Sequence, residues 1–520
     1  MKKTIEIMEN GIKKERVVSY IPFRYIFNII LILLEVIAVI TILILITIYV
    51  PYFFIAVLVT QIGVAISIIG RNDNPDYKLP WLFLVLFIPI IGFMLYFMFY
   101  SRNLSHKQQK KIEKIKNELV LKDDEEEFLK LKEIDAYVYT QALALKKLSS
   151  SHLYTNTKIT YFSLGDELFP ALIEDLKKAQ KFIFMEYFII ENGLFWDMIL
   201  NVLKEKAKSG IEVRIIYDDI GCMMTLPGNY YKKLEHCGIK CVPFSKLQGQ
   251  ANNKFNNRSH RKIAIIDGKI AYTGGINLAD EYINRVIKYG HWKDVGIRLV
   301  GEAINEFTRL FLIDYNLNDK KAKDIFSSYY YQEEIKEEGY CIPFGDGPKP
   351  IFERQVSKNA IMNLLNGAQK YVYITTPYLI IDNELMSTIE NCALRGVDVR
   401  IITPHIPDKK VVFLMTRSYY SRLINAGVRI YEYEKGFIHA KTYIADGKVA
   451  IVGTINLDYR SLVHHFENGV WMYQCKAIND MEKDFLNTQE KSLEYHKDML
   501  KQNLWTRFIR SLVKIFAPLL

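Results

Sequence analysis

One motif with the residues of phosphate chemistry is written twice in this chain. "SHRKIAIIDGKIAYTGGIN" begins at Ser259, and "IHAKTYIADGKVAIVGTIN" ends at Asn456. Each copy reads His-x-Lys-x-x-x-x-Asp followed by Gly-x-x-Asn, and recurrence of the whole pattern argues against coincidence. The polar members of the two copies are His260, Lys262, Asp267, Asn277, His439, Lys441, Asp446 and Asn456.

The spacing within each copy suits a phosphate group. Residues two apart on a strand share a face, so each histidine and the following lysine point the same way. An ammonium group neutralises a phosphoryl oxygen, while an imidazole can attack phosphorus or move a proton. Two copies face to face would place a nucleophile and a general acid on opposite sides of one phosphorus. We therefore predict a two-step displacement in which the two histidines have different roles.

The two aspartates have two possible roles. Both motifs end in Asp-Gly, at Asp267 and at Asp446, and this pair is a strong signal for a tight hairpin turn. We group Asp267 and Asp446 with the catalytic candidates. The alternative is that they only brace their hairpins.

Further blocks recur in the same order and predict the elements that position the motifs. "AQKFIFMEYFII" matches "AQKYVYITTPYLI", and "SGIEVRIIYDD" matches "RGVDVRIITPH". A helical pattern lies between the two blocks of each copy. This alternation predicts an α/β fold built from βαβ units, with a mixed, mostly parallel sheet in each half. Two homologous halves would form one bilobal catalytic unit.

The N-terminal part of the 520-residue chain reads as a membrane segment. Three apolar stretches, at about 26–50, 52–70 and 79–100, are each long enough to cross a bilayer, which takes about 20 residues. Lys and Arg flank both ends of this segment and favour the cytoplasm for both. Three full spans cannot satisfy both ends, so either one stretch is re-entrant or the N-terminus lies on the opposite side. The stretch 52–70 is the weakest span. We expect a multi-pass protein of the cell membrane with its catalytic unit on the cytoplasmic face.

Changes in composition divide the chain into five parts. A membrane segment (1–100) is followed by a charged helical connector near the membrane surface (101–152), a first repeat (153–325), a second repeat (326–490) and a C-terminal amphipathic helix (491–520). In that last helix Trp505, Phe508 and Leu512 follow helical spacing, with Arg507 and Arg510 between them. It fits either an anionic membrane surface or the catalytic core.

Charge and cysteine content narrow the class of partner. The formal net charge of +10 suggests an anionic partner, and the six cysteines form no CxxC pair, which favours a reducing compartment. A basic chain would suit a nuclease, but several apolar segments do not. We expect acidic membrane lipid as the partner and no nucleic acid.

The repeated motif and its flanking stretches resemble those of a known family. The doubled His-x-Lys-x4-Asp with Gly-x-x-Asn is similar to the phospholipase D superfamily. The stretches "GGINLADEY", "GHWKDVGIRLVG", "TPYLIIDNELM" and "TINLDYRS", and the apolar "NPDYKLPWLFLVLFIPIIGFMLYF", resemble the bacterial cardiolipin synthases in particular. The chain departs from the family in Thr454, where Ser is common, and in three apolar stretches where two are usual.

The resemblance implies a reaction and residue roles. One histidine attacks phosphatidylglycerol, releases glycerol and carries the phosphatidyl group, and a second phosphatidylglycerol accepts that group to give cardiolipin. The family pattern assigns the nucleophile to His260 and the general acid and base to His439, although the reverse stays open. It also pairs each histidine with an acid of the opposite half, Glu467 with His260 and Asp294 with His439.

The remaining roles and the alternatives follow from the same resemblance. Lys262, Lys441, Asn277 and Asn456 would hold the phosphoryl oxygens. The scheme needs no metal ion and no cofactor. Alternatives with the same motifs are a phospholipase D, a phosphatidylserine synthase or a nuclease, and a non-catalytic scaffold that binds acidic lipid.

Overall fold

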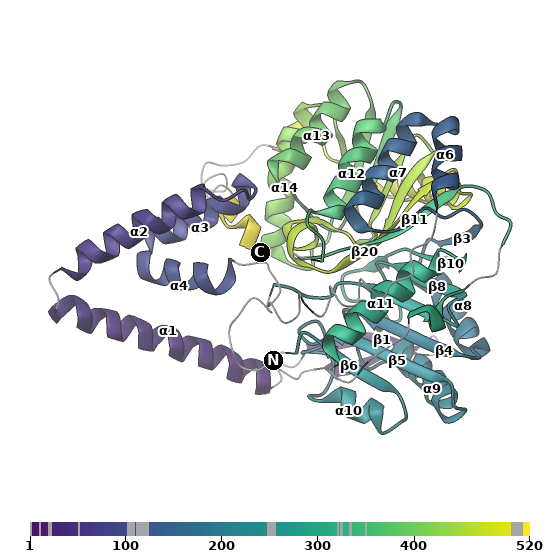
Figure 1. Ribbon diagram of the computed structural model, residues 1–520, viewed down its shortest axis with the longest axis horizontal. Helices are drawn as coiled ribbons and strands as arrows, with labels where there is room; N and C mark the ends of the chain where they lie inside the picture. The colour runs from purple at the N-terminus through teal and green to yellow at the C-terminus, as the bar shows by residue number, and fades with distance from the viewer. Residues whose placement is uncertain are drawn as a thin grey trace.

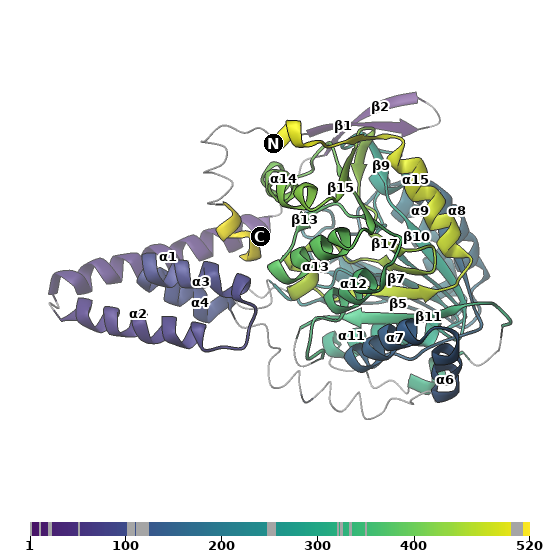
Figure 2. The same ribbon diagram turned by 90° about the horizontal axis from the view of Figure 1, so that it is seen from above.

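The computed structural model describes residues 3–9, 12–18, 23–49, 52–100, 110, 124–246, 256–319, 322, 326–331, 335–348, 351–500 and 513–519. Two α/β halves lie one above the other, and a group of N-terminal helices projects from one side (Figure 1). The same arrangement seen from above is in Figure 2. The predicted α/β fold with two sheet-bearing halves is confirmed.

The first half is built on a seven-stranded sheet with the order β3-β10-β8-β7-β4-β5-β6. Its strands are β3 (Thr157–Phe162), β4 (Phe182–Tyr187), β5 (Glu212–Asp218), β6 (Lys240–Phe244), β7 (Lys262–Ile266), β8 (Ile270–Gly274) and β10 (Gly296–Gly301). The helices of this half are α8 (Gly165–Lys178), α9 (Leu194–Lys208), α10 (Tyr230–Glu235) and α11 (Ile304–Asn318).

The second half repeats this order and adds one strand at its edge, giving β11-β20-β18-β17-β12-β14-β15-β21. Its strands are β11 (Tyr340–Asp346), β12 (Tyr371–Thr375), β14 (Asp398–Pro404), β15 (Arg429–Tyr433), β17 (Thr442–Ala445), β18 (Val449–Gly453), β20 (Glu467–Tyr473) and β21 (Ser492–Glu494). The helices are α12 (Val356–Gly367), α13 (Asn383–Leu394), α14 (Lys410–Asn425) and α15 (Ala477–Gln489).

The prediction that these sheets are mostly parallel is wrong. Among the described strands of these two sheets, the neighbours that pair in parallel are β4-β5-β6 and β12-β14-β15, and in each set a connection that contains a helix joins one strand to the next. The motif hairpins β7-β8 and β17-β18, and the returning strands β10 and β20, pair antiparallel. The sheets are therefore mixed and mainly antiparallel.

Local sequence explains why the crossover helices end where they do. α9 and α13 are the two helices expected between the recurring blocks. Each is followed within two residues by a glycine of positive φ, Gly210 (84°) after α9 and Gly396 (90°) after α13. Glycine adopts this left-handed conformation without a Cβ penalty and stops a helix.

One hydrophobic core joins the two halves. It contains Phe307 and Phe311 of α11 together with Phe344 of β11 and Phe466 just before β20. Burial of apolar surface across this boundary fixes the halves relative to one another. The two repeats thus form a single unit, and residues far apart in sequence can meet at its centre.

The N-terminal helices are α1 (Phe23–Tyr49), α2 (Phe53–Ile69), α3 (Pro75–Phe87) and α4 (Pro89–Phe99), preceded by a hairpin of β1 (Lys3–Glu9) and β2 (Ile12–Val18). α1 runs away from the catalytic unit and α2 returns toward it, with α3 and α4 between them near the unit (Figures 1 and 2). Among the described residues, only Ile26–Tyr49 is both long and apolar enough to cross a membrane by length and composition.

The apolar stretch 79–100 is not one helix. The chain leaves helical geometry at Ile88 (φ −132°, ψ 68°), directly before Pro89, and folds back. Gly92 then packs against the backbone of α3, where a Cβ would lie 2.3 Å from the carbonyl oxygen of Leu84. Proline ends the first helix and glycine permits the close return. The α3–α4 hairpin is therefore too short to span a bilayer at either helix.

Two further parts differ from the expected layout. α6 (Glu125–Ile134) and α7 (Ala136–Ser149), the described part of the connector, pack on the second half through core residues Leu131 and Leu145. The expected C-terminal helix includes β21, while 501–512, with Trp505, Arg507, Phe508, Arg510 and Leu512, lie outside the described residues. The described end, 513–519, contacts both the catalytic unit and α3, through Lys514 over the ring of Tyr419 and Phe516 against Phe83.

Candidate active site

Each motif forms a β-hairpin whose turn is held by its aspartate. Asp267 and Gly268 have φ values of 55° and 68°, and Asp446 and Gly447 have 55° and 64°, as a tight two-residue turn requires. The Asp267 carboxylate accepts hydrogen bonds from three backbone N–H groups, those of residues 180, 181 and 182, at 2.7–3.0 Å. Asp446 accepts from residues 369, 370 and 371 in the same way.

This placement changes the interpretation of both aspartates. Asp267 and Asp446 lie at the far ends of β7 and β17 from the histidines, and their oxygens are used by backbone. The structure thus favours the bracing role over the catalytic one. They position β7, which begins at Lys262, and β17, which begins directly after Lys441.

Short parallel bridges bring the two halves together around the histidines. The N–H of His260 donates to the carbonyl of Phe466 (2.9 Å), and the N–H of His439 donates to the carbonyl of Lys293 (2.7 Å). β16 (Gly436–Ile438) pairs in parallel with β9 (His291–Lys293), and Ser259 forms the equivalent bridge to Phe466. Each motif is therefore docked on the segment that carries an acid of the opposite half.

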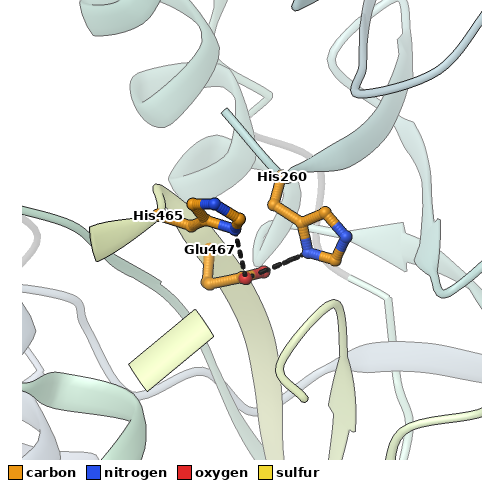
Figure 3. Close-up of side chains that lie close together, drawn as sticks. All are labelled: His260, His465 and Glu467. Carbon is orange, nitrogen blue, oxygen red and sulfur yellow. Dashed lines mark hydrogen bonds and ion pairs between the residues drawn. The ribbon is translucent and has the colours of Figure 1, made fainter. Parts of the chain in front are cut away.

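The expected pairing of histidines and acids is present. Nδ1 of His260 lies 3.0 Å from both carboxylate oxygens of Glu467, and Nδ1 of His439 lies 2.7 Å from Oδ2 of Asp294. Figure 3 shows the first of these pairs. All four side chains are buried. A carboxylate accepts only, so Nδ1–H is the donor in each pair and the lone pair is on Nε2.

The two lysines act on both imidazoles. Lys262 and Lys441 are buried, and each donates through Nζ to the carbonyl of its own motif's histidine. Burial lowers the pKa of each imidazole well below 6.5, and the positive charges of Lys262 and Lys441 lower both further. Since each lysine is close enough to act on both rings, the four groups share one site. Both histidines are neutral in the free protein near pH 7.

Burial also shifts the pKa values of the charged groups toward neutrality. It lowers the pKa of Lys262 to about 7 and that of Lys441 to about 8. It raises the pKa of Asp294 and of Glu467 to about 7 each. Charged groups with such values, clustered in one buried place, are typical of functional sites.

The two asparagines are not equivalent. Oδ1 of Asn277 accepts from the N–H of Ile189 (3.1 Å), and its Nδ2 donates to the hydroxyl of Tyr282 (2.7 Å). Oδ1 of Asn456 is buried without a hydrogen-bond partner among the described residues. Asn277 is thus tied into its own half through both atoms of its amide, whereas the amide oxygen of Asn456 makes no such bond to a described residue.

The two acids are also held differently. Gly275 lets Asp294 approach so closely that a Cβ there would lie 2.0 Å from Oδ1 of Asp294. The residue at the same place in the second motif is Thr454, whose hydroxyl donates to Glu467, and Ser461 Oγ donates to Glu467 as well, at 2.7 Å. Where the family commonly has Ser, the threonine supplies the same hydroxyl.

Several residues around the histidines were not singled out from the sequence. His439 is enclosed by aromatic rings, with Tyr282 at 5.5 Å and Trp292 at 5.8 Å between ring centroids. His260 contacts the ring of Phe188 (5.0 Å) and that of a third histidine, His465 (5.6 Å). His465 and Trp292 each stand two residues before the acid of their half. That shared spacing in "HHFE" and "HWKD" is the signal that identifies them.

The sequence matches the family described as "Cardiolipin synthase, PLD-like domain" twice, over residues 172–310 and 361–488. Residues 60–99 match the family "Phospholipase_D-nuclease N-terminal". The first family accounts for both halves of the catalytic unit, and the second for most of α2 and the α3–α4 hairpin.

Similar proteins extend over nearly the whole chain. An uncharacterized protein of Streptococcus mutans serotype c is 42% identical over 466 residues, 88% of this chain and 100% of the relative. A protein named cardiolipin synthase, from Oceanobacillus iheyensis, is 34% identical over 473 residues, 89% of this chain and 98% of the relative.

A solved structure is similar in fold. The phosphatidylserine synthase of Haemophilus influenzae superimposes with a TM-score of 0.56 at 16% sequence identity, covering 74% of this chain and 98% of that one. The family match covers both halves, and the cardiolipin synthase of Oceanobacillus iheyensis aligns over nearly its whole length. The chain therefore belongs to the phospholipase D-like family of cardiolipin synthases.

Proposed function

We propose that this protein is a cardiolipin synthase that transfers a phosphatidyl group from one phosphatidylglycerol to another, giving cardiolipin and glycerol. The observation that carries the proposal is the crossed pair of imidazoles, each bonded to an acid of the opposite half, in one buried site with two lysines. The 34% identity to a protein named cardiolipin synthase over most of the chain supports the choice of reaction.

In the first step Nε2 of His260 attacks the phosphorus of phosphatidylglycerol. Glu467 accepts the Nδ1–H hydrogen bond, holds the ring and stabilises the positive charge that develops on it. The bond from phosphorus to the glycerol oxygen breaks, and His439 gives that oxygen a proton. A bound anionic phosphodiester raises the pKa of His439, so the ring can carry this proton in the complex although it is neutral in the free protein.

In the second step the free hydroxyl of another phosphatidylglycerol attacks the phosphatidyl-histidine. His439, now neutral, takes the hydroxyl proton, and the bond from phosphorus to His260 breaks. Lys262 and Lys441 stabilise the phosphoryl oxygens in both transition states, where the charge is greatest. The side-chain nitrogen Nδ2 of Asn456 can donate to the same oxygens, while Nδ2 of Asn277 already donates to Tyr282 and positions its own half.

The N-terminal helices give the enzyme its place at the membrane. α1 and α2 run in opposite directions, α1 is long enough to span, and the 17 residues of α2 are at the lower limit for a span. With α3–α4 as a re-entrant hairpin, two spans return the chain to the side on which it began. This arrangement would satisfy the positive flanks at both ends, and it supports our proposal that the catalytic unit lies on the cytoplasmic face.

Lipid analysis after expression in a bacterial host without its own cardiolipin synthases tests the proposed reaction. We expect cardiolipin in cells that make the wild-type chain and none with His260→Ala. Purified protein with labelled phosphatidylglycerol should release glycerol and cardiolipin in equal amounts. Phosphatidic acid without cardiolipin would instead indicate a phospholipase D, and unchanged cardiolipin with His260→Ala would indicate that the motif is not catalytic.

A further inference from the structure

A third histidine stands beside the His260–Glu467 pair and has no role in the proposed reaction. The ring of His465 is 8% exposed, and its Nδ1 lies 3.9 Å from Oε1 of Glu467. Neither ring nitrogen has a hydrogen-bond partner among the described residues. Figure 3 shows His465 and His260 on either side of the Glu467 carboxylate. Burial removes water from both ring nitrogens, and no hydrogen bond to a described residue compensates for that loss. A bound ligand would provide the missing partner.

We propose that His260, His465 and Glu467 form a binding site for a transition-metal ion of the zinc class, and that this ion inhibits the enzyme reversibly. One ligand atom from each residue lies within 4.8 Å of the others. Zinc binds nitrogen and oxygen at about 2.0–2.2 Å, so its tetrahedral ligands are about 3.3–3.5 Å apart. The 3.0 Å and 3.9 Å separations from Glu467 lie on either side of this value.

The ligand types select the class of ion. Two imidazoles and one carboxylate suit zinc and its transition-metal neighbours, whereas magnesium and calcium prefer oxygen ligands. Three protein ligands leave the fourth tetrahedral position open to water. Ser461 and Thr454 donate to the Glu467 carboxylate and fix its orientation, as outer partners of metal ligands do.

A polar cavity gives an ion a route to these ligands. His465 lines a cavity of about 630 Å³ between the catalytic unit and the loop that joins α2 to α3. Its other lining residues include Arg71 and Tyr100 of the N-terminal segment and Lys358 and Glu384 of the second half. The third histidine therefore faces both this cavity and the reacting pair.

The charges at the site limit the affinity without excluding the ion. The ammonium groups of Lys262 and Lys441 oppose a cation, and the carboxylates of Asp294 and Glu467 offset them. Burial holds the pKa of His465, like that of His260, well below 6.5, so both rings are neutral and able to bind a metal near pH 7. Reversible binding is the expected result.

Coordination would stop the proposed reaction at its nucleophile. Binding of an ion to Nδ1 of His260 requires the lone pair of that nitrogen, so the proton moves from Nδ1 to Nε2. With the proton on Nε2, the ring cannot attack phosphorus. The inhibitory part of the inference rests on the proposed function, whereas metal binding does not.

Cobalt absorption and zinc inhibition together test this site. Purified full-length protein in detergent is titrated with Co²⁺, whose visible absorption reports tetrahedral coordination, and its cardiolipin synthesis is measured with and without Zn²⁺. We expect His465→Gln and His465→Asn each to weaken cobalt binding at least about tenfold and to reduce fold inhibition by zinc correspondingly. His405→Gln is the matched control, because His405 also lies 3.0 Å from a buried carboxylate, that of Glu432.

The outcomes separate the two proposals. Equal cobalt binding and equal zinc inhibition in wild type and both His465 variants would refute the metal site. Loss of cobalt absorption only in His405→Gln would assign the metal elsewhere and also refute it. Cobalt bound through His465 in a protein that makes no cardiolipin would refute the proposed function and leave the metal site standing.

Discussion

Nδ1 of His439 lies 2.7 Å from Oδ2 of Asp294, although the two residues are 145 positions apart and belong to different halves. The pair His260–Glu467 crosses in the opposite direction over 207 positions. Neither half therefore contains a complete histidine–acid pair, and the site exists only where the halves meet. This explains why the motif is needed twice and why the shared hydrophobic core matters for chemistry.

We expect both acids, Asp294 and Glu467, to be essential for the reaction and to contribute little to the free energy of unfolding. Asp294→Asn and Glu467→Gln keep the shape but replace a charged acceptor by an amide. Each should reduce the rate of cardiolipin formation about 10²- to 10⁴-fold, the range of a general acid–base contribution. Single-turnover measurements on labelled phosphatidylglycerol check this, with circular dichroism to confirm folding. Full activity in either variant would contradict the role of the crossed pairs.

Removal of the second histidine should trap the covalent intermediate. His439→Asn can neither protonate the departing glycerol nor deprotonate the acceptor, so both steps should slow, and phosphatidyl-His260 that forms slowly in the first step should persist and accumulate. Mass spectrometry of the protein after reaction with phosphatidylglycerol measures the added mass and its position. The reciprocal variant, His260→Asn, should carry no adduct. An adduct on His439 in that variant would reverse the roles of the two histidines.

The pH dependence should be narrow because four buried groups titrate near neutrality. Burial raises the pKa of Asp294 and Glu467 to about 7, so both carboxylates are lost as acceptors as the pH falls through 7. Burial lowers the pKa of Lys262 to about 7 and that of Lys441 to about 8, so the positive charge of Lys262 is lost first and that of Lys441 next as the pH rises through 7 and 8. The profile of kcat/KM should fall on both sides, with a limiting acid slope of about two because two groups must be charged.

Two comparisons check which groups produce the acid and the alkaline limb of the pH profile. Asp294→Asn removes one acid and should reduce the acid slope to about one. A bound anionic phosphodiester raises the lysine pKa values, so the alkaline limb of kcat should lie at higher pH than that of kcat/KM. An unchanged acid limb in Asp294→Asn would exclude Asp294 as its source.

The repeat explains how much of the fold was readable from sequence. Equivalent blocks in the same order predicted two equivalent halves, and the two sheets have the same seven-strand order. The direction of pairing was not readable, since alternation of apolar residues is the same in parallel and antiparallel strands. The break at Pro89 was missed for another reason, because mean hydropathy over 79–100 ignores the proline and glycine that fold the chain back.

The site residues that belong to the repeated motif could be predicted from the sequence. The residues that reach the site only because the two halves dock could not. His260, Lys262, His439 and Lys441 stand at fixed spacings, so the doubled motif predicted that they belong to one site. Strand geometry did not explain how they meet, because β7 begins only at Lys262 and β17 only at Thr442. His465 enters the site only because the parallel bridge between Ser259 and Phe466 sets the second half beside His260. Contacts created by the docking of two halves have no local sequence pattern.

Gly275 should tolerate no side chain. A Cβ at this position would lie 2.0 Å from Oδ1 of Asp294, so Gly275→Ala must displace the acid that holds His439. We expect a loss of activity comparable to that of Asp294→Asn. Gly228→Ala is the control, since nothing lies within 4 Å of a Cβ there. Equal activities of the two alanine variants would show that the close approach to Asp294 has no catalytic consequence.

Replacement of Asp267 tests whether the aspartate of the motif has a structural or a catalytic role. Asp267→Ala removes an acceptor of three backbone hydrogen bonds and places alanine at a φ of 55°, so it should lower the free energy of unfolding by about 2–3 kcal/mol. Because the carboxylate is distant from the imidazoles, turnover per folded molecule should be retained below the melting temperature. Thermal unfolding and activity, measured on the same preparation, give both quantities. Asp446→Ala is the matched variant in the other half and should behave alike, since its carboxylate makes the equivalent three bonds. A fall in kcat without a fall in Tm would return both aspartates to the catalytic set.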